Sequence, residues 1–386
     1  MAGQPIAVNA LMVPVKGYAV NVRIRAPRPV PAREGRPEWV VVSERIWPSG
    51  AATAIGSMPG NDPAEAAAVV FGELPDFPHL PELPDRGVGA DMLGRTAALL
   101  VDLAVDVVPS GYRVASRPGH EHRRAVDLLR WDLDAVQEAR EKAGVVPPVF
   151  KVQLAGPWTL GAGIELPRGH RVLTDRGALR DFTSSLLDGL AEHVAEVRAR
   201  TGAPVVVQFD EPSLPAVLAG GLSTPSGYGS VPAVPEPEAR QLLNTVIEGA
   251  RRITDRPVIL HCCAGKPPLA LLREAGADAL AFDLAALDGA SAEFLDEIGE
   301  VWDGGATLFL GAVPATVSGA SPSLKDVGEP AFRLADRLGF NRSVLAERAV
   351  PTPACGLAGA TPEWMRRALS LTRDLGKAFV EPPEGW

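Results

Sequence analysis

The chain is poor in cysteine, in aromatic residues and in positive charge. Its 386 residues include three cysteines and 5% aromatic residues, and 38 Lys and Arg stand against 47 Asp and Glu, a formal net charge of −9. So few cysteines in a long chain exclude a disulfide framework and indicate a reducing compartment. The acidic balance argues against a nucleic-acid-binding face.

The chain also lacks an apolar run long enough to span a membrane. The best candidate, residues 145–164, is interrupted by Lys151 and by several prolines and glycines, so it predicts loops and a strand. The N-terminus has no continuous apolar region before a small-residue cleavage site, which a signal peptide needs. We therefore expect a cytoplasmic protein with neither a membrane nor a nucleic acid as partner.

The first 48 residues differ in composition from the rest. They carry seven Lys or Arg and three Glu, and residues 26–37 are rich in proline and arginine. This composition predicts an N-terminal extension over residues 1–48, disordered in part, and a single folded domain over residues 49–386.

From residue 49 onward, short apolar runs alternate with amphipathic stretches. Eight runs have the length of buried strands: 51–57, 105–108, 150–154, 204–209, 257–260, 279–282, 307–310 and 348–351. Helix signals separate most of them, such as the N-cap, proline and acid of Asp62-Pro63-Ala64-Glu65. The alternation predicts an α/β fold, a (β/α)8 TIM-type barrel of parallel strands with helices outside.

Three soft donor residues follow these runs at their carboxyl ends, where such a barrel places its active site. His261 and Cys263 are two apart, so they face the same side of a strand, and Cys355 follows the last run. Each residue alone is more often a core residue, but their coincidence at strand ends favours a metal site. Two thiolates and an imidazole suit zinc, and three protein ligands leave a position open for catalysis.

Two further residues belong to this prediction. Asp283 follows the next apolar run and is a candidate fourth ligand, since a carboxylate can leave when a better ligand arrives. Cys262 is expected to face the helix-packed side as an inert apolar residue. A substrate thiol has a pKa near ~8.5, and coordination to zinc deprotonates it and so makes it a nucleophile. Two thiolate ligands favour alkyl transfer to that sulfur over hydrolysis.

Other strand ends offer groups that could bind a small substrate. Asp210 and Glu211 precede a proline, so one carboxylate can meet an ammonium group while the other caps a helix or supports a neighbour. Backbone amides and the hydroxyl of Ile55-Gly56-Ser57 can hold a carboxylate. Trp158 can offer a stacking face to a flat ring. Ordinary turns and core packing explain the same segments without a ligand.

Together these segments resemble the C-terminal catalytic domain of cobalamin-independent methionine synthase, in the family's order, over roughly residues 50–378. The matching pieces are Ile55-Gly56-Ser57, Gly156-Pro157, Asp210-Glu211-Pro212, His261-x-Cys263, Asp283 and Cys355-Gly356-Leu357. The resemblance implies a zinc-dependent methyltransferase that transfers a methyl group from a methylated folate to homocysteine, giving methionine.

The resemblance also implies roles for single residues. His261, Cys263 and Cys355 match zinc ligands, and Asp283 stands where the family usually has a glutamate ligand. Asp210 matches the residue that holds the amino group of homocysteine, and Ser57 with its backbone neighbours matches the carboxylate site. A second amino-group carboxylate is implied within residues 71–106, where the sequence does not single one out.

The departures from the family leave alternatives open. The chain is too short for the family's second, N-terminal barrel, which helps to hold the folate, so a methyl-corrinoid donor remains an alternative. Residues 77–84 are more similar to barrels of the uroporphyrinogen decarboxylase group. A metal-free decarboxylase of that kind would need arginines at the barrel mouth, for which Arg113, Arg117 and Arg168 are candidates. A catalytically silent zinc-binding barrel is the third alternative.

Overall fold

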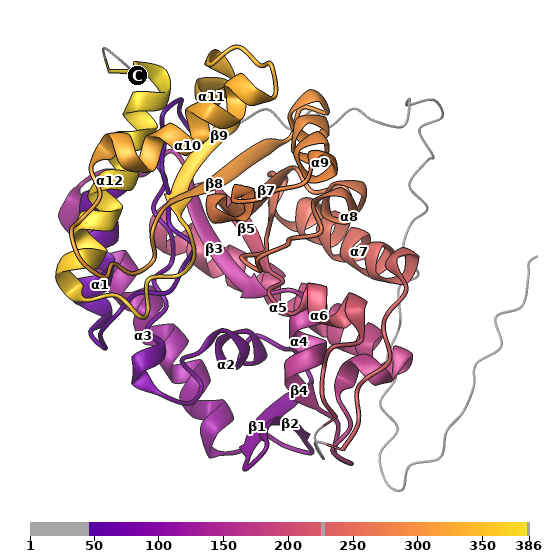
Figure 1. The fold of residues 1–386 in the computed structure, drawn as a ribbon. Coiled ribbons are helices and arrows are strands. Elements are labelled where there is room, and N and C mark those ends of the chain that lie inside the picture. The colour runs from indigo at the N-terminus through magenta and orange to yellow at the C-terminus, as the bar shows by residue number, and fades with distance from the viewer. Residues whose placement is uncertain (1–45, 225–227, 384–386) are drawn as a thin grey trace, which may run out of the picture. The chain divides into compact units, whose positions relative to one another are not determined.

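The centre of the molecule is a curled, parallel, six-stranded sheet in the order β3-β5-β6-β7-β8-β9 (Figure 1). The computed structural model describes residues 46–224 and 228–383, so all but the last three residues of the predicted N-terminal extension lie outside the described part. The strands of the sheet are β3 (Phe150–Ala155), β5 (Val205–Asp210), β6 (Val258–His261), β7 (Ala279–Asp283), β8 (Thr307–Val313) and β9 (Ala349–Pro353).

Two extended segments close this sheet into a barrel. Residues 51–57 lie beside β9, where the amide of Thr53 donates to the carbonyl of Pro351 across 3.4 Å. Residues 77–82 lie beside β3 through a parallel bridge between His79 and Lys151. The two segments meet each other at a parallel bridge between Ser57 and Glu82. The arrangement confirms the TIM-type barrel expected from the sequence.

One predicted barrel strand is wrong. The run at 105–108 forms β1 (Ala104–Val108), which pairs antiparallel with β2 (Gly111–Ala115) in a small separate sheet that also contains β4 (Ile164–Glu165). The second barrel position belongs instead to residues 77–82. Prolines at 78 and 81 deprive that segment of two amide donors and of a regular strand pattern, so the sequence does not indicate a strand there.

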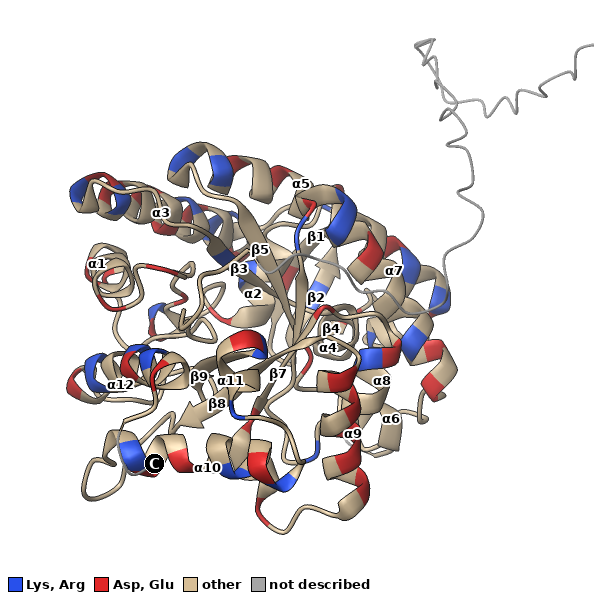
Figure 2. Cartoon of the chain, turned by 90° about the horizontal axis from the view of Figure 1, so that it is seen from above, with Lys and Arg blue, Asp and Glu red and all other residues tan. Residues whose placement is uncertain are grey.

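Helices cover the outside of the sheet (Figure 1). Charged residues are spread along the helices, as Figure 2 shows from above, but Arg95 and Asp132 are buried. The α-helices are α1 (Pro63–Glu73), α2 (Met92–Ala97), α3 (His120–Ala143), α4 (Pro157–Gly163), α5 (Arg176–Thr201), α6 (Leu214–Ala219), α7 (Glu236–Thr254), α8 (Leu269–Glu274), α9 (Ala292–Asp303), α10 (Leu324–Arg337), α11 (Ser343–Arg348) and α12 (Pro362–Val380); the 3-10 helices are η1 (Pro84–Arg86), η2 (Val172–Thr174) and η3 (Leu284–Leu287). The predicted cap of α1 is confirmed, because the Asp62 carboxylate accepts from the amide of Ala64 across 2.8 Å.

The interior of the barrel has an apolar floor. Trp47 stacks on Phe77 with ring centroids 5.3 Å apart, and it meets Phe309 edge-on at 5.4 Å. Trp47 therefore belongs to the barrel core, although the sequence analysis placed it in the extension. Beyond this floor the inward side chains of β3 and β5 become polar, beginning with the fully buried Lys151.

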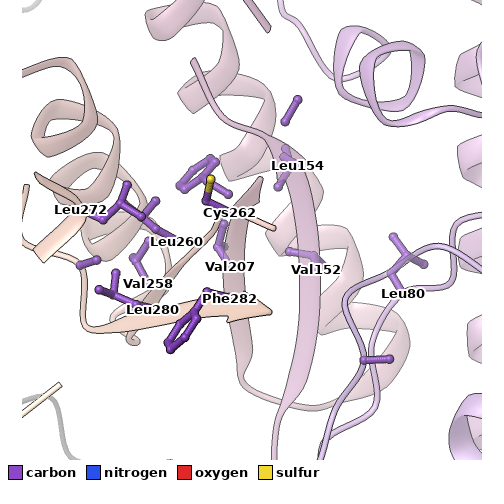
Figure 3. Close-up of a cluster of buried hydrophobic side chains, with 14 of the residues drawn as sticks. Leu80, Val152, Leu154, Val207, Val258, Leu260, Cys262, Leu272, Leu280 and Phe282 are labelled. Atoms are coloured by element: carbon purple, nitrogen blue, oxygen red, sulfur yellow. The ribbon is translucent and has the colours of Figure 1, made fainter. Parts of the chain in front are cut away.

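Between strands and helices lies a second, larger core. Figure 3 shows Cys262 within it, near Val207 and Leu260. Cys262 is fully buried, and burial raises the pKa of its thiol to about 11. The prediction that Cys262 faces the helix-packed side is confirmed. Within the described residues, none of the helices has the length and apolar character needed to cross a membrane.

Candidate metal centre

Three donor side chains converge at the carboxyl ends of β6 and β9. His261 ends β6, Cys263 follows it by two residues, and Cys355 follows β9 by two residues. One ligand atom from each lies within 4.8 Å of the others. Parallel strands bring these residues together although 92 positions separate the two cysteines, because their carboxyl ends meet at one rim of the barrel.

Asp210 sets the orientation of the His261 ring. The two residues are paired in register on β5 and β6, and Oδ1 of Asp210 lies 2.6 Å from Nδ1 of His261. Nε2 of the ring is buried and has no hydrogen-bond partner among the described residues. A carboxylate on one ring nitrogen and a free, buried second nitrogen are the usual arrangement of a metal-binding histidine.

The two cysteines share a hydrogen bond of 3.0 Å between their sulfur atoms. Both are free thiols, and the sulfurs are too far apart for a disulfide, whose bond length is about 2.05 Å. The hydrogen bond between the two sulfurs and the nearby His261 lower the pKa of Cys355 to about 6 against the opposing effect of burial. The pKa of Cys263 is raised by the same bond and by burial. The pair therefore favours loss of the proton from Cys355 over loss from Cys263.

Asp283 lies near this group but not within it. Its carboxylate accepts from the amide of Ala285 across 2.8 Å and caps a short 3-10 helix. Asp283 and Cys355 line the same cavity of about 660 Å³, which opens between β7, β8 and α10. Burial raises the pKa of Asp283. A role for Asp283 as fourth ligand stays a prediction.

The Ile55-Gly56-Ser57 segment packs directly against the loop that carries Cys355. The carbonyl of Ser57 accepts from the amide of Leu357 across 2.7 Å. A methyl group added to Gly356 would lie 2.0 Å from the Ser57 hydroxyl oxygen. Only glycine fits at that position without displacing Ser57, and the contact brings the candidate carboxylate site beside the metal ligands.

Glu211 and Trp158, two of the candidate site residues, are engaged in contacts with the scaffold. Both carboxylate oxygens of Glu211 accept hydrogen bonds at the start of α4, from the amides of Trp158 and Thr159 and from the Thr159 hydroxyl, at 2.7–3.0 Å. The Trp158 ring is 1% exposed, and its indole nitrogen donates to the carbonyl of Ala239 on α7. Glu211 is therefore the helix-capping member of its pair, and Trp158 offers no free face for stacking.

Glu82 lies beside the candidate site, within the range 71–106 where the sequence analysis did not single out a carboxylate. It is buried, its amide donates to the carbonyl of Gly56, and it is bridged to Ser57. Burial and the charge of Asp210 raise the pKa of Glu82 to about 7, although Arg95 opposes them. Because the carboxylates of Glu82 and Asp210 repel each other, an ammonium group bound between them would be stabilised by both.

The chain matches a family model described as "Cobalamin-independent synthase, Catalytic domain" over residues 50–378. The chain belongs to this family. It is therefore a methyltransferase of the methionine synthase type, and the match spans the whole barrel. A comparison with curated proteins finds no match.

Solved structures with the same fold include two relatives of low identity. A B12-independent methionine synthase from Shewanella sp. W3-18-1 in complex with selenomethionine has 13% identity and a TM-score of 0.50, over 85% of this chain and 97% of that chain. A methyltransferase from Methanosarcina mazei has 18% identity and a TM-score of 0.52, over 85% and 93%. These likenesses support the barrel fold.

Proposed function

We propose that this protein is a zinc-dependent methyltransferase that methylates the thiol of homocysteine, with a methylated folate as donor. The convergence of His261, Cys263 and Cys355 on one point carries the proposal, and the family supports it. The donor set fits zinc because it contains two thiols and a buried imidazole nitrogen without a partner. Such ligands need a reducing compartment, which supports a cytoplasmic location.

The surrounding residues are suited to bind the amino acid end of the substrate. Asp210 and Glu82 are buried carboxylates at the rim and would hold the ammonium group, while Ser57 and the amide nitrogens beside it would hold the carboxylate. These contacts would place the thiol next to Cys263 and Cys355. A bound zinc ion would be a Lewis acid that favours the thiolate form of the substrate. Its fourth coordination position would be taken by Asp283 or left open for the substrate.

In the reaction, the thiol gives up its proton and its sulfur attacks the methyl carbon. A sulfur–carbon bond forms while the donor's nitrogen–methyl bond breaks, and the donor nitrogen takes up a proton. The cavity of about 660 Å³ beside Cys355 would offer space for the donor. With a methyl-corrinoid donor, the bond that breaks is the cobalt–methyl bond.

The decarboxylase alternative has less support. It needs arginines at the barrel mouth, but Arg113 is bound to Glu165 across the small sheet of β2 and β4. Arg117 and Arg168 are exposed. The soft donors at the mouth have no part in that chemistry.

The test is metal content and activity of the purified protein, beside Cys355→Ser and the matched control Cys262→Ala. We expect one zinc per chain in the wild type and the control, and loss of zinc and activity in Cys355→Ser. Assays with a methylated folate and with a methyl-corrinoid in parallel identify the donor. A metal-free wild type with full activity would contradict the proposal, and a zinc-loaded protein inactive with both donors would favour the silent barrel.

A further inference from the structure

A chain of hydrogen bonds runs through the barrel from a fully buried lysine to His261. Nζ of Lys151 donates to Oε1 of Gln208 across 2.7 Å. Nε2 of Gln208 donates to Oδ1 of Asp210 across 2.7 Å, and the same oxygen lies 2.6 Å from Nδ1 of His261. All four side chains are at least nine-tenths buried.

Lys151 has one acceptor for each of its three protons. Besides Gln208, it donates to the carbonyl of Ile55 across 2.9 Å and to Oε1 of Gln153 across 3.2 Å. An ammonium group satisfies this arrangement completely, because it offers three donors and no acceptor. Burial lowers the pKa of Lys151 to about 7, while Asp210 and Glu82 raise it.

Lys151, together with the Ile55 carbonyl and the Asp210 carboxylate, determines which way the Gln208 amide points. With Oε1 facing Lys151, Nε2 faces the carbonyl of Ile55 at 3.0 Å and the carboxylate of Asp210. The reversed amide would set its NH₂ group against an ammonium and its oxygen against two other oxygens, which is unfavourable at every contact. The Asp210 carboxylate therefore accepts a hydrogen bond from Gln208 and can also accept one from His261.

We propose that Lys151 is a positioning residue that acts through Gln208 and Asp210 to hold His261 with Nδ1 protonated and Nε2 free for the metal. The inference rests on the proposed function of the same site. Groups that orient a metal-binding histidine change metal affinity by about 10- to 100-fold when they are removed. Lys151 also binds the carbonyl of Ile55, so one side chain links the metal centre to the candidate carboxylate site.

The test is a double-mutant cycle on zinc affinity, measured by chelator competition. Lys151→Met and Gln208→Met are each expected to weaken zinc binding about 10- to 100-fold. The double variant should be no weaker than Gln208→Met alone, because the lysine acts only through the glutamine. Gln153→Met is the matched control: it removes another partner of Lys151 without touching Asp210, and it should bind zinc as the wild type does. Additive losses, or wild-type affinity in Lys151→Met, would overturn the inference.

A second readout is the tautomer of His261 in the metal-free protein, followed by ¹⁵N NMR of the imidazole. The wild type should show a protonated Nδ1, and Lys151→Met should lose this preference. If Lys151→Met does not fold, Gln208→Glu takes its place, because it keeps a partner for Lys151 but removes the donor to Asp210. An inactive wild type with the expected tautomer would contradict the proposed function alone; an active wild type whose variants keep the tautomer would contradict this inference alone.

Discussion

At the scale of single residues, the two buried carboxylates of the rim make a prediction about substrate affinity. Glu82→Gln removes a charge but preserves shape, so the KM for homocysteine should rise by about 10- to 100-fold, as expected for a lost charged hydrogen bond. Zinc content should stay unchanged. The matched comparison is 4-mercaptobutanoate, which has no amino group: wild type and variant should methylate it equally. An equal loss with both thiols would show that Glu82 acts on the scaffold and not on the ammonium group.

The sequence predicts that three candidate metal ligands lie close together, and the structure brings their side chains within 4.8 Å of one another. His261, Cys263 and Cys355 are each more often core residues when taken singly, and only their coincidence at the ends of apolar runs pointed to a shared site. Glu82 and Lys151 were not readable in this way. Their roles depend on which groups face them inside the barrel, and that depends on a strand register the sequence does not display.

At the scale of elements, the cap of α4 predicts the effect of changing Glu211. Glu211→Gln weakens three hydrogen bonds to Trp158 and Thr159, so the free energy of unfolding should fall by about 1–3 kcal/mol. Zinc stoichiometry and kcat should change little below the unfolding transition. Urea unfolding and metal analysis measure both. If Glu211→Gln instead had the stability of the wild type but no activity, Glu211 would have a role in the reaction and not in the scaffold.

The loop after β9 gives a second prediction at this scale. In Gly356→Ala the new methyl group would lie 2.0 Å from the Ser57 hydroxyl oxygen, and overpacking of this kind costs about 1–3 kcal/mol. The double variant Gly356→Ala/Ser57→Ala removes that oxygen and should recover part of the stability. Thermal unfolding of the four proteins of the cycle tests the contact. Strictly additive losses would show that the two residues do not meet.

The elements themselves were predictable to the extent that their patterns are regular. Six of the eight apolar runs form the sheet, because continuous β-rich runs between amphipathic helices are typical of parallel strands. The run at 105–108 was misassigned, since a hairpin strand has the same composition as a barrel strand. Residues 77–82 were not predicted as a strand, since the segment contains two prolines and only a few bridges join it to its neighbours.

At the scale of the whole molecule, a buried histidine predicts how stability depends on pH. His193 lies on α5, and burial, with a smaller contribution from Arg95, lowers its pKa from 6.5 to about 3. The unfolded chain therefore binds a proton at a higher pH than the folded chain does. The contribution of neutral His193 to the free energy of unfolding is fully present above pH 6.5, and it is lost as the pH falls toward 3.

His193→Gln removes this titration, so its free energy of unfolding should fall less steeply with acid than that of the wild type. Between pH 7 and pH 4 the gap between the two proteins should change by roughly 2–3 kcal/mol in favour of the variant. Urea unfolding at a series of pH values measures the gap and cancels the acid sensitivity that both proteins share. His120→Gln is the control, because that side chain is 80% exposed and stays solvated in both states. Parallel curves for wild type and His193→Gln would mean that His193 is already protonated, or reaches water, in the folded barrel.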